Sequence, residues 1–257
     1  MGIIAPMSVS VPLSIRIHGS GDRSVLLVHG WMMTSAVWDS VVPVLTEAGF
    51  RVLQPDLRGA GESHAADAYR LEDHANDLAA LAESLKLSNL VVIGHSMGGQ
   101  IAQMFAANHP ELVSQLVLLN SVPASGMPLP AELMGLFSSS PGDRDKQGAI
   151  LDMATTQLSS SGRERLLELA AAVQADAITG GLLAWTGGGF VDRLSDITAP
   201  TDIIATSDPF LPVAFLQSAI VDPIANATLH VLEGPGHYPQ VEAPDKTAAL
   251  LRDLISG

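Results

Sequence analysis

Short runs of Val, Ile and Leu recur along the whole chain, and each run is bounded by Gly, Pro or polar residues. Runs of this length and composition predict β-strands, and the uninterrupted ones are typical of strands buried on both faces of a sheet. The predicted strands span residues 8–17, 24–28, 51–54, 90–93, 116–119, 202–205 and 229–232.

Apolar residues at helical spacing occupy most of the segments between these runs. The predicted helices span residues 38–45, 71–85, 98–109 and 247–255. The alternation of strands and helices predicts an α/β fold, in which a mostly parallel central sheet carries helices on both faces. Residues 122–197 interrupt the alternation, and we expect them to form a small helical cap inserted into a core of residues 1–121 and 198–257. An ordinary packed helical excursion is the alternative for this segment.

The composition narrows the classes of function. The 257 residues are 47% hydrophobic and 16% charged, enough to bury a substantial core. The net charge of −14 repels phosphate backbones and anionic lipid surfaces, so we expect no nucleic-acid partner. We expect no membrane insertion either, because no apolar run reaches the length of a membrane helix. The absence of a basic amino-terminal region and of cysteine favours a soluble, cytoplasmic protein.

Ser96 is the candidate nucleophile. It lies in Gly94-His95-Ser96-Met97-Gly98, between a predicted buried strand and a predicted helix. A serine at such a tight turn adopts a strained backbone, and glycines two positions before and after it let the strand and the helix approach each other. The turn therefore predicts a hydroxyl exposed above the sheet. A solvated serine in a Gly-rich loop is the alternative.

A serine hydroxyl needs a base, and the base needs a group that orients it. His237 follows the last predicted strand, at the edge of the sheet where Ser96 is expected, and it is our candidate base. Asp208 follows the strand before it and is our candidate orienting carboxylate. The other suitable strand end, at Asn120 and Ser121, offers no carboxylate.

The attack of a serine on an ester produces an oxyanion, which needs two N–H donors held in place beforehand. The backbone of Met97, directly after the nucleophile, is expected to supply one donor. The other is expected from the turn after the strand at 24–28, where Gly30 permits an unusual backbone. Trp31 is the preferred donor of that turn, and Met32 is the alternative.

The expected substrate is an uncharged, moderately apolar small molecule, because Met, Leu, Phe and Trp are frequent in the predicted cap. No cofactor and no metal site is expected, since no His pair has ligand spacing and the proposed chemistry needs neither. The expected pocket residues are Met32, His95, Met134, Phe137, Trp185, Phe210 and Tyr238.

Over nearly its whole length the chain resembles the α/β-hydrolase fold superfamily. The resemblance lies in the turn at Ser96, in His29-Gly30-Trp31, in residues 56–63, and in Gly236-His237-Tyr238-Pro239 followed by Glu242. The superfamily order of serine, acid and histidine is also present. The resemblance implies a serine carboxylesterase-like enzyme with a small helical cap, which forms an acyl-enzyme at Ser96 and releases it with water activated by His237.

Some members of the superfamily act differently, and this sequence departs from them. Haloalkane dehalogenases and epoxide hydrolases carry an aspartate where Ser96 stands. Cofactor-free perhydrolases often carry a proline where Met32 stands. Lactone hydrolysis and perhydrolysis would use the same triad and remain alternatives within the enzyme class. A ligand-binding protein that keeps the fold without useful turnover is the alternative from another class.

Overall fold

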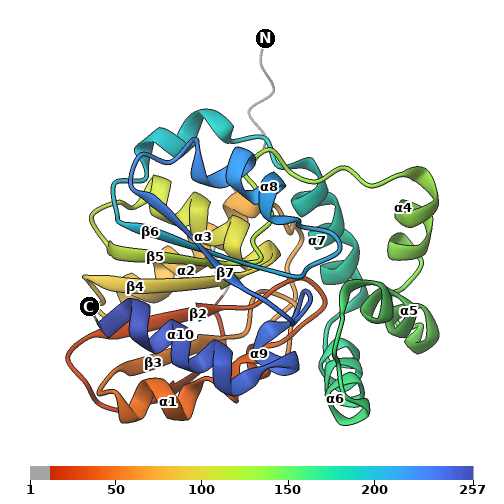
Figure 1. Ribbon diagram of the computed structural model, residues 1–257, viewed down its shortest axis with the longest axis horizontal. Coiled ribbons are helices and arrows are strands. Elements are labelled where there is room, and N and C mark those ends of the chain that lie inside the picture. Colours follow the sequence, from red (N-terminus) through yellow and green to blue (C-terminus); the bar gives the residue numbers. More distant parts are fainter. Residues whose placement is uncertain (1–11, 257) are drawn as a thin grey trace.

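The computed structural model describes residues 12–256, and a seven-stranded sheet forms its centre (Figure 1). The strands are β1 (Ile15–His18), β2 (Ser24–Val28), β3 (Arg51–Pro55), β4 (Leu90–His95), β5 (Val113–Leu119), β6 (Thr201–Thr206) and β7 (Ala227–Leu232). Their order is β1-β3-β2-β4-β5-β6-β7; β1 runs antiparallel to β3, and the other neighbours are parallel. The predicted mostly parallel sheet is confirmed.

Helices cover both faces of the sheet, as predicted. They are η1 (Ser35–Trp38), α1 (Val42–Glu47), α2 (Leu71–Ser84), α3 (Met97–Asn108), α4 (Ala131–Ser138), α5 (Arg144–Ala154), α6 (Ser160–Ala171), α7 (Ala175–Gly187), η2 (Val191–Asp196), α8 (Val213–Leu216), η3 (Gln217–Val221), α9 (Pro239–Glu242) and α10 (Pro244–Ser256). In one layer α1 lies beside α10, and in the other α2 lies beside α3 (Figure 1).

Two predicted elements differ from the structure. The strand predicted over residues 8–17 begins only at Ile15 within the described residues, and residues 8–11 lie outside them. The helix predicted over residues 38–45 begins too early, because Trp38 ends the 3-10 helix η1 and α1 begins only at Val42. Pro43 explains the break: proline has no N–H to donate, so it fits only the first turn of a helix.

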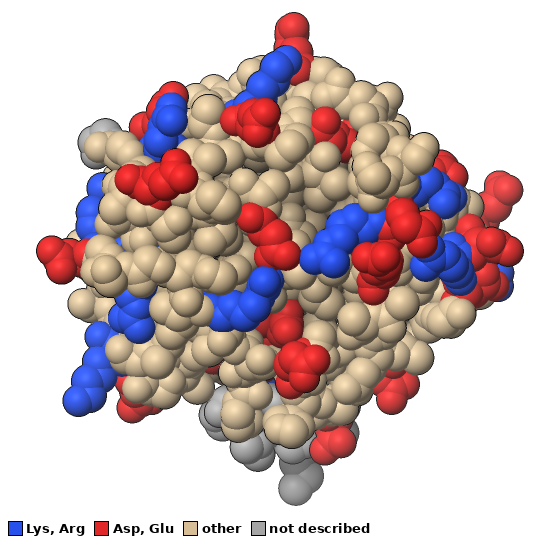
Figure 2. Space-filling model, turned by 90° about the horizontal axis from the view of Figure 1, so that it is seen from below, with Lys and Arg blue, Asp and Glu red and all other residues tan. Residues whose placement is uncertain are grey.

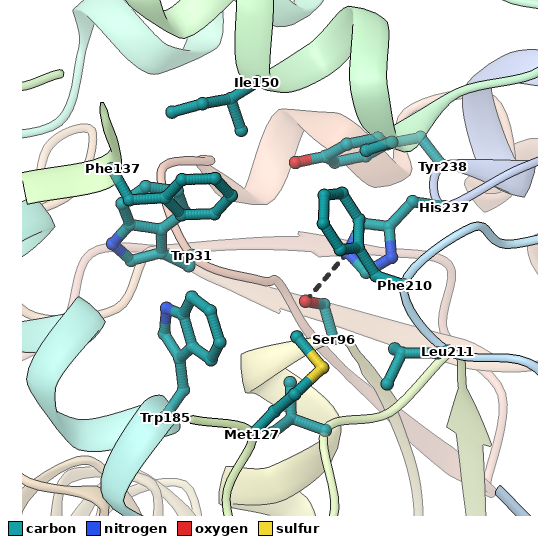
Figure 3. Close-up of a pocket in the computed structure, with 12 residues that line it drawn as sticks. Trp31, Ser96, Met127, Phe137, Ile150, Trp185, Phe210, Leu211, His237 and Tyr238 are labelled. Atoms are coloured by element: carbon teal, nitrogen blue, oxygen red, sulfur yellow. Dashed lines mark hydrogen bonds between the residues drawn. The ribbon is translucent and has the colours of Figure 1, made fainter. Parts of the chain in front are cut away.

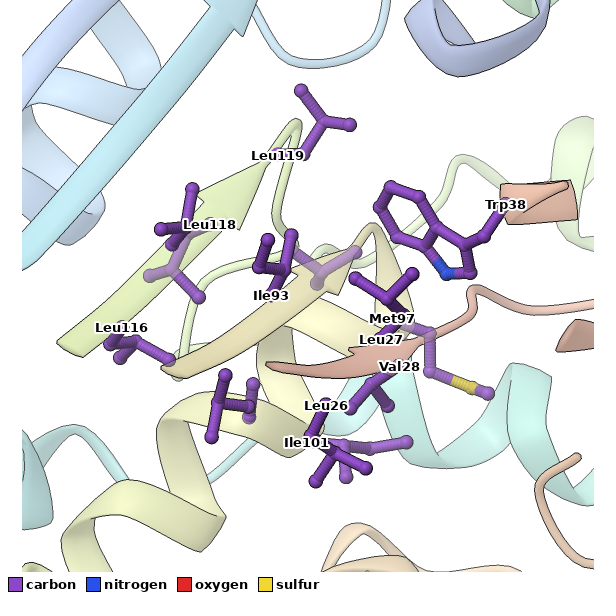
Figure 4. Close-up of a cluster of buried hydrophobic side chains, with 14 of the residues drawn as sticks. Leu26, Leu27, Val28, Trp38, Ile93, Met97, Ile101, Leu116, Leu118 and Leu119 are labelled. Carbon is purple, nitrogen blue, oxygen red and sulfur yellow. The ribbon is translucent and has the colours of Figure 1, made fainter. Parts of the chain in front are cut away.

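The two central strands β2 and β4 hold the core together. Every residue of both strands is buried, and their side chains contact those of β5 and α3 (Figure 4). Trp38 lies in the same cluster and is fully buried. Each large apolar side chain removed from water contributes about 1.5–3 kcal/mol. The loops at the ends of these strands therefore extend from two fully buried strands.

The strand order also shows where a ligand can bind. From β2 the chain passes to β3 on one side and then to β4 on the other side of β2, so the direction of winding reverses between β2 and β4. In open parallel sheets such a reversal leaves a crevice at the carboxyl ends of the two strands. The turns after Val28 and after His95 lie at this crevice.

The helices α4 to α7 lie within residues 122–197, the segment between β5 and β6 that the sequence analysis predicts to be a cap. In Figure 1 they lie together at one end of the sheet. That residues 122–197 form a separate cap domain stays a prediction. On the face shown in Figure 2, acidic and basic side chains are interspersed. None of the described helices is long and apolar enough to cross a bilayer.

Candidate active site

Ser96 lies at a sharp turn between β4 and α3. Its backbone angles are φ 56° and ψ −123°, a conformation that non-glycine residues rarely adopt. The turn is possible because its neighbours carry no side chain: a Cβ at Gly94 would lie 2.5 Å from the carbonyl oxygen of Gly98. The strained turn predicted from the glycine spacing is present. It is the backbone arrangement that lifts a serine hydroxyl out of a sheet.

Glycines also bring the turn after β2 against Ser96. A Cβ at Gly98 would lie 2.8 Å from the carbonyl carbon of His29, and a Cβ at Gly30 would lie 3.0 Å from the Cβ of Ser96. The role of Gly30 differs from the expectation, because the left-handed residue of this turn is Met32, with φ 61°. Gly30 is needed for close approach rather than for an unusual backbone.

The structure brings Ser96, His237 and Asp208 together from the ends of three strands. His237 Nε2 lies 2.9 Å from Ser96 Oγ (Figure 3). His237 Nδ1 lies 2.6 Å from Asp208 Oδ2. A carboxylate only accepts hydrogen bonds, so Nδ1–H donates to Asp208 and Nε2 is left to accept from the serine hydroxyl. This is the arrangement in which an imidazole removes a proton from an attacking serine.

Asp208 is held in place by its own loop. Its second carboxylate oxygen, Oδ1, accepts a hydrogen bond of 2.8 Å from the backbone N–H of Phe210, and its side chain has no exposed surface. The side chain of His237 is 12% exposed. A buried carboxylate with both oxygens engaged keeps one orientation, so the imidazole that donates to it also keeps one orientation.

The carbonyl group of His237 is held by two buried side chains that the sequence did not assign to this role. His95 Nε2 donates to it over 2.7 Å, and Asn120 Nδ2 donates over 3.3 Å. Asn120 also donates to the carbonyl of Gly236 over 3.0 Å. Burial lowers the pKa of His95 well below its usual value, so His95 is neutral. Its expected place in the pocket wall is therefore wrong: His95 lies behind the base and positions its loop.

Asn120 occupies the strand end at which the sequence offered no carboxylate. The identity of the residue was visible, but its partners lie more than a hundred positions away in the chain. No local pattern indicates that an asparagine after β5 will contact the loop after β7. This contact could be found only once the order and register of the strands were known.

The two backbone donors expected for an oxyanion are both free. Within the described residues, neither the N–H of Trp31 nor the N–H of Met97 donates a hydrogen bond. The N–H of Met97 belongs to the first turn of α3, where a helix leaves its donors unpaired. Trp31 lines the same cavity as Ser96. The arrangement can therefore stabilise negative charge that develops beside the serine oxygen.

His29, in the turn that carries Trp31, supports the backbone. Its Nε2 accepts a hydrogen bond of 2.9 Å from the backbone N–H of Leu57, so Nδ1 carries the proton and donates to the carbonyl of Gly30 over 2.9 Å. Burial lowers the pKa of His29 and keeps the ring neutral, as this pattern requires. His29 thus ties the turn after β2 to the loop after β3.

The cavity above Ser96 is apolar. The volume not occupied by protein atoms is about 490 Å³, including the part at the mouth of the cavity that is open to solvent. Its lining residues are Trp31, Ser96, Val122, Met127, Phe137, Ile150, Ala154, Trp185, Phe210, Leu211, His237 and Tyr238. Phe137 stacks on Trp31 with ring centres 5.3 Å apart, and Figure 3 shows Trp185 beside this pair. None of these described lining residues is Asp, Glu, Lys or Arg, so the cavity is suited to an uncharged ligand.

Four of the expected pocket residues, Phe137, Trp185, Phe210 and Tyr238, do line the cavity. Met32, His95 and Met134 do not. Met32 and His95 are buried in the core, and Met134 packs only partly buried against it. The lining residues that the sequence missed are Val122, Met127, Ile150, Ala154 and Leu211. The core and the pocket contain the same types of apolar residue, so the sequence alone does not show which residues line the pocket.

No group of three or more His, Asp or Glu side chains in the described residues converges in a way that could hold a metal ion. The buried ion pair of Arg58 and Asp77 has a structural role. Arg58 binds the carboxylate of Asp77 through Nε and Nη2, at 2.7 and 2.8 Å, with both side chains buried. This pair ties the loop after β3 to α2.

Comparison with known proteins adds the family context. The sequence profile of the alpha/beta hydrolase fold family matches residues 23–244. The chain is 29% identical to a non-heme haloperoxidase of Rhodococcus erythropolis, over 85% of this chain and 86% of the relative. It is 27% identical to a 2-hydroxy-6-oxononadienedioate/2-hydroxy-6-oxononatrienedioate hydrolase of Paraburkholderia xenovorans, over 93% and 88%.

A solved structure shows the same fold. The esterase of Exiguobacterium antarcticum superposes with a TM-score of 0.88, covering 95% of this chain and 96% of that chain at 24% sequence identity. At this level of identity the likeness concerns the arrangement of strands and helices. The three similar proteins bear the names of different activities, so the chemistry of this chain has to be argued from its own site.

Proposed function

The chain belongs to the alpha/beta hydrolase fold family, and on that premise we propose that it is a serine hydrolase of carboxylic esters. The proposed substrates are small to medium, uncharged and apolar. The observation that carries the proposal is the continuous contact from Asp208 through His237 to Ser96, at the floor of a cavity without charged lining residues.

The reaction proceeds in two halves. Ser96 Oγ attacks the ester carbonyl carbon while His237 Nε2 takes the hydroxyl proton, and the N–H groups of Trp31 and Met97 stabilise the oxyanion. The C–O bond to the alcohol then breaks, the alcohol leaves with the proton from His237, and the acyl group stays on Ser96. Water deprotonated by His237 attacks the acyl-enzyme, and the carboxylic acid leaves as Ser96 regains its proton.

The walls of the cavity support the substrate class. Trp31, Phe137, Trp185, Phe210 and Tyr238 are five of the eleven aromatic residues of the chain, which has 3 Trp, 2 Tyr and 6 Phe. Aromatic side chains bind apolar groups over a large area at a small cost in conformational entropy. The net charge of −14 disfavours anionic esters further.

Perhydrolysis is the second candidate, and the likeness to the haloperoxidase favours it. In that reaction hydrogen peroxide replaces water as the nucleophile on the acyl-enzyme and a peracid leaves. Lactone hydrolysis is a further alternative, since a lactone is an ester closed into a ring. All three reactions pass through the same acyl-enzyme at Ser96 and differ only in the substrate or the second nucleophile.

The test is a panel of p-nitrophenyl esters of increasing acyl length, simple lactones, and acetate with hydrogen peroxide, each assayed with the wild type and Ser96→Ala. We expect ester hydrolysis that Ser96→Ala lowers by about 10⁴-fold or more. His237→Ala is expected to lose as much, and Asp208→Asn less. A loss below tenfold for His237→Ala would remove it from the role of base. Absence of Ser96-dependent turnover on every member of the panel would favour a ligand-binding protein.

A further inference from the structure

The carboxylate of Glu242, which the proposed reaction does not use, accepts four backbone hydrogen bonds. Its Oε2 accepts from the N–H groups of Thr156, Gln157 and Gly236, at 2.9, 3.0 and 2.9 Å. Its Oε1 accepts from the N–H of Tyr238 at 3.0 Å. No Lys or Arg of the described residues forms an ion pair with it. The negative charge of Glu242 is thus matched by backbone N–H dipoles.

The four donors belong to two segments that are far apart in sequence. Gly236 and Tyr238 flank His237 on either side, whereas Thr156 and Gln157 lie in the loop between α5 and α6. One side chain therefore holds the loop of the proposed base and the loop of the inserted helices at the same time. Since α5 supplies Ile150 and Ala154 to the cavity, Glu242 also fixes one cavity wall relative to the base.

Further contacts join the same two segments directly. The N–H of His237 donates to the carbonyl of Ala154 over 2.9 Å, and Thr156 Oγ1 donates to the carbonyl of Gly234 over 2.7 Å. A Cβ at Gly236 would lie 2.7 Å from the carbonyl oxygen of Ala154, so the segments approach as closely as glycine permits. With its N–H bound to α5 and its carbonyl bound by His95 and Asn120, His237 is held on both sides of its backbone.

We propose that Glu242 is a positioning residue for the reaction at Ser96: its carboxylate docks the α5–α6 loop onto the loop of His237 and so keeps His237 Nε2 within reach of Ser96 Oγ. This inference rests on the proposed function, because it assumes that His237 is the base. It goes beyond it by making the inserted helices part of the machinery that aligns the base.

The proposed role depends on the carboxylate of Glu242. Hydrogen bonds from N–H groups to a carboxylate are about twice as strong as those to neutral acceptors, and Glu242→Ala removes all four. Glu242→Gln keeps one oxygen for the three backbone donors at Oε2, but its NH₂ group then faces the N–H of Tyr238. The glutamine variant therefore loses one contact, and it is expected to retain the fold and an intermediate activity.

The first readout separates alignment from binding. For the best ester of the panel, we expect Glu242→Ala to lower kcat about 10- to 100-fold while KM changes less than about threefold, because misplacement of a reacting group by 1 Å can cost about 100-fold. We expect Glu242→Gln to lower kcat about threefold to tenfold. Glu233→Ala is the matched control. Glu233 is exposed and has no hydrogen-bond partner among the described residues, so the kcat of this variant is expected to stay unchanged.

The second readout needs no activity. Amide hydrogen exchange measures the docking itself, and we expect the amides of Thr156, Gln157, Gly236 and Tyr238 to exchange at least about tenfold faster in Glu242→Ala, with the central strands unchanged. If the wild type hydrolyses no ester, the proposed function fails while this measurement still tests the docking.

Two results would overturn the inference. One is a kcat of Glu242→Ala within twofold of the wild type, or, if that variant does not fold, the same result for Glu242→Gln. The other is unchanged exchange of the four amides in a folded variant.

Discussion

The close approach of α3 to β2 makes a sharp prediction for Gly98→Ala. The added Cβ would lie 2.8 Å from the carbonyl carbon of His29, and closer still to the carbonyl oxygens of His29 and Val28. Ordinary contact begins at 3.4 Å, so the backbone of α3 has to withdraw by more than 0.6 Å from the end of β2. Both partners are backbone atoms in the rigid centre of the molecule, and neither can rotate away.

The cost follows from these contacts. Overpacking of a rigid site typically costs about 1–3 kcal/mol, and the better helix propensity of alanine returns less than about 1 kcal/mol. We expect the free energy of unfolding to fall by about 2 kcal/mol, which for a chain of this length corresponds to a Tm lower by about 4–8 °C. The displacement also moves the N–H of Met97 relative to that of Trp31, so we expect kcat to fall about 100-fold.

Calorimetry and the ester assay test both parts. The matched control is Gly135→Ala, because Gly135 lies on the exposed side of α4 and a Cβ there would meet no atom within 4 Å. In that variant alanine should raise the free energy of unfolding by about 0.5–1 kcal/mol and leave kcat unchanged. If Gly98→Ala has the Tm and the kcat of the wild type, the reasoning from close approach is refuted.

Three further predictions follow from buried groups. Burial lowers the pKa of His74 to about 3, so between pH 6.5 and about 3 the unfolded chain binds a proton that the folded chain does not. The free energy of unfolding therefore has its full value above pH 6.5 and decreases as the pH falls, by up to about 1.4 kcal/mol per pH unit from this one group. His74→Leu should remove this pH dependence from urea unfolding curves recorded between pH 4 and 8. Asn120→Ala removes the donors that hold the His237 loop; it should lower the free energy of unfolding by about 2 kcal/mol and kcat about tenfold, and an unchanged kcat would exclude a role in alignment. Phe137→Ala removes the ring stacked on Trp31, so KM should rise for short acyl chains and fall for long ones; an unchanged chain-length profile would show that this wall does not contact the acyl group.

The fold was predictable because its signals are local. The uninterrupted apolar run of β4 indicates a strand buried on both faces, and the glycines on either side of Ser96 indicate a tight turn into a helix. Strand periodicity does not depend on distant partners, so the order of elements could be assigned before any contact was known. The helix predicted over residues 38–45 begins too early, since α1 starts at Val42, directly before Pro43, although the effect of a proline on a helix start is equally local.

The site was predictable in part for the same reason. Ser96, Asp208 and His237 each follow a predicted strand, and the parallel sheet places the carboxyl ends of its strands at one edge. The lining of the pocket was harder to predict. Met127 and Ile150 line it while Met134 does not, although the three side chains are alike in chemistry.

Residue types at fixed local spacing were enough to indicate the sheet, the strained turn at Ser96, and Ser96, Asp208 and His237 as candidate nucleophile, orienting carboxylate and base. The contacts that hold these three side chains in place could be identified only from the packing of the folded chain. Asn120 contacts the His237 loop across more than a hundred residues, and Glu242 joins that loop to the α5–α6 loop some eighty residues away. Such contacts arise from the register and packing of elements that are distant in the chain. The residues next to each partner in the sequence therefore do not indicate the hydrogen bond.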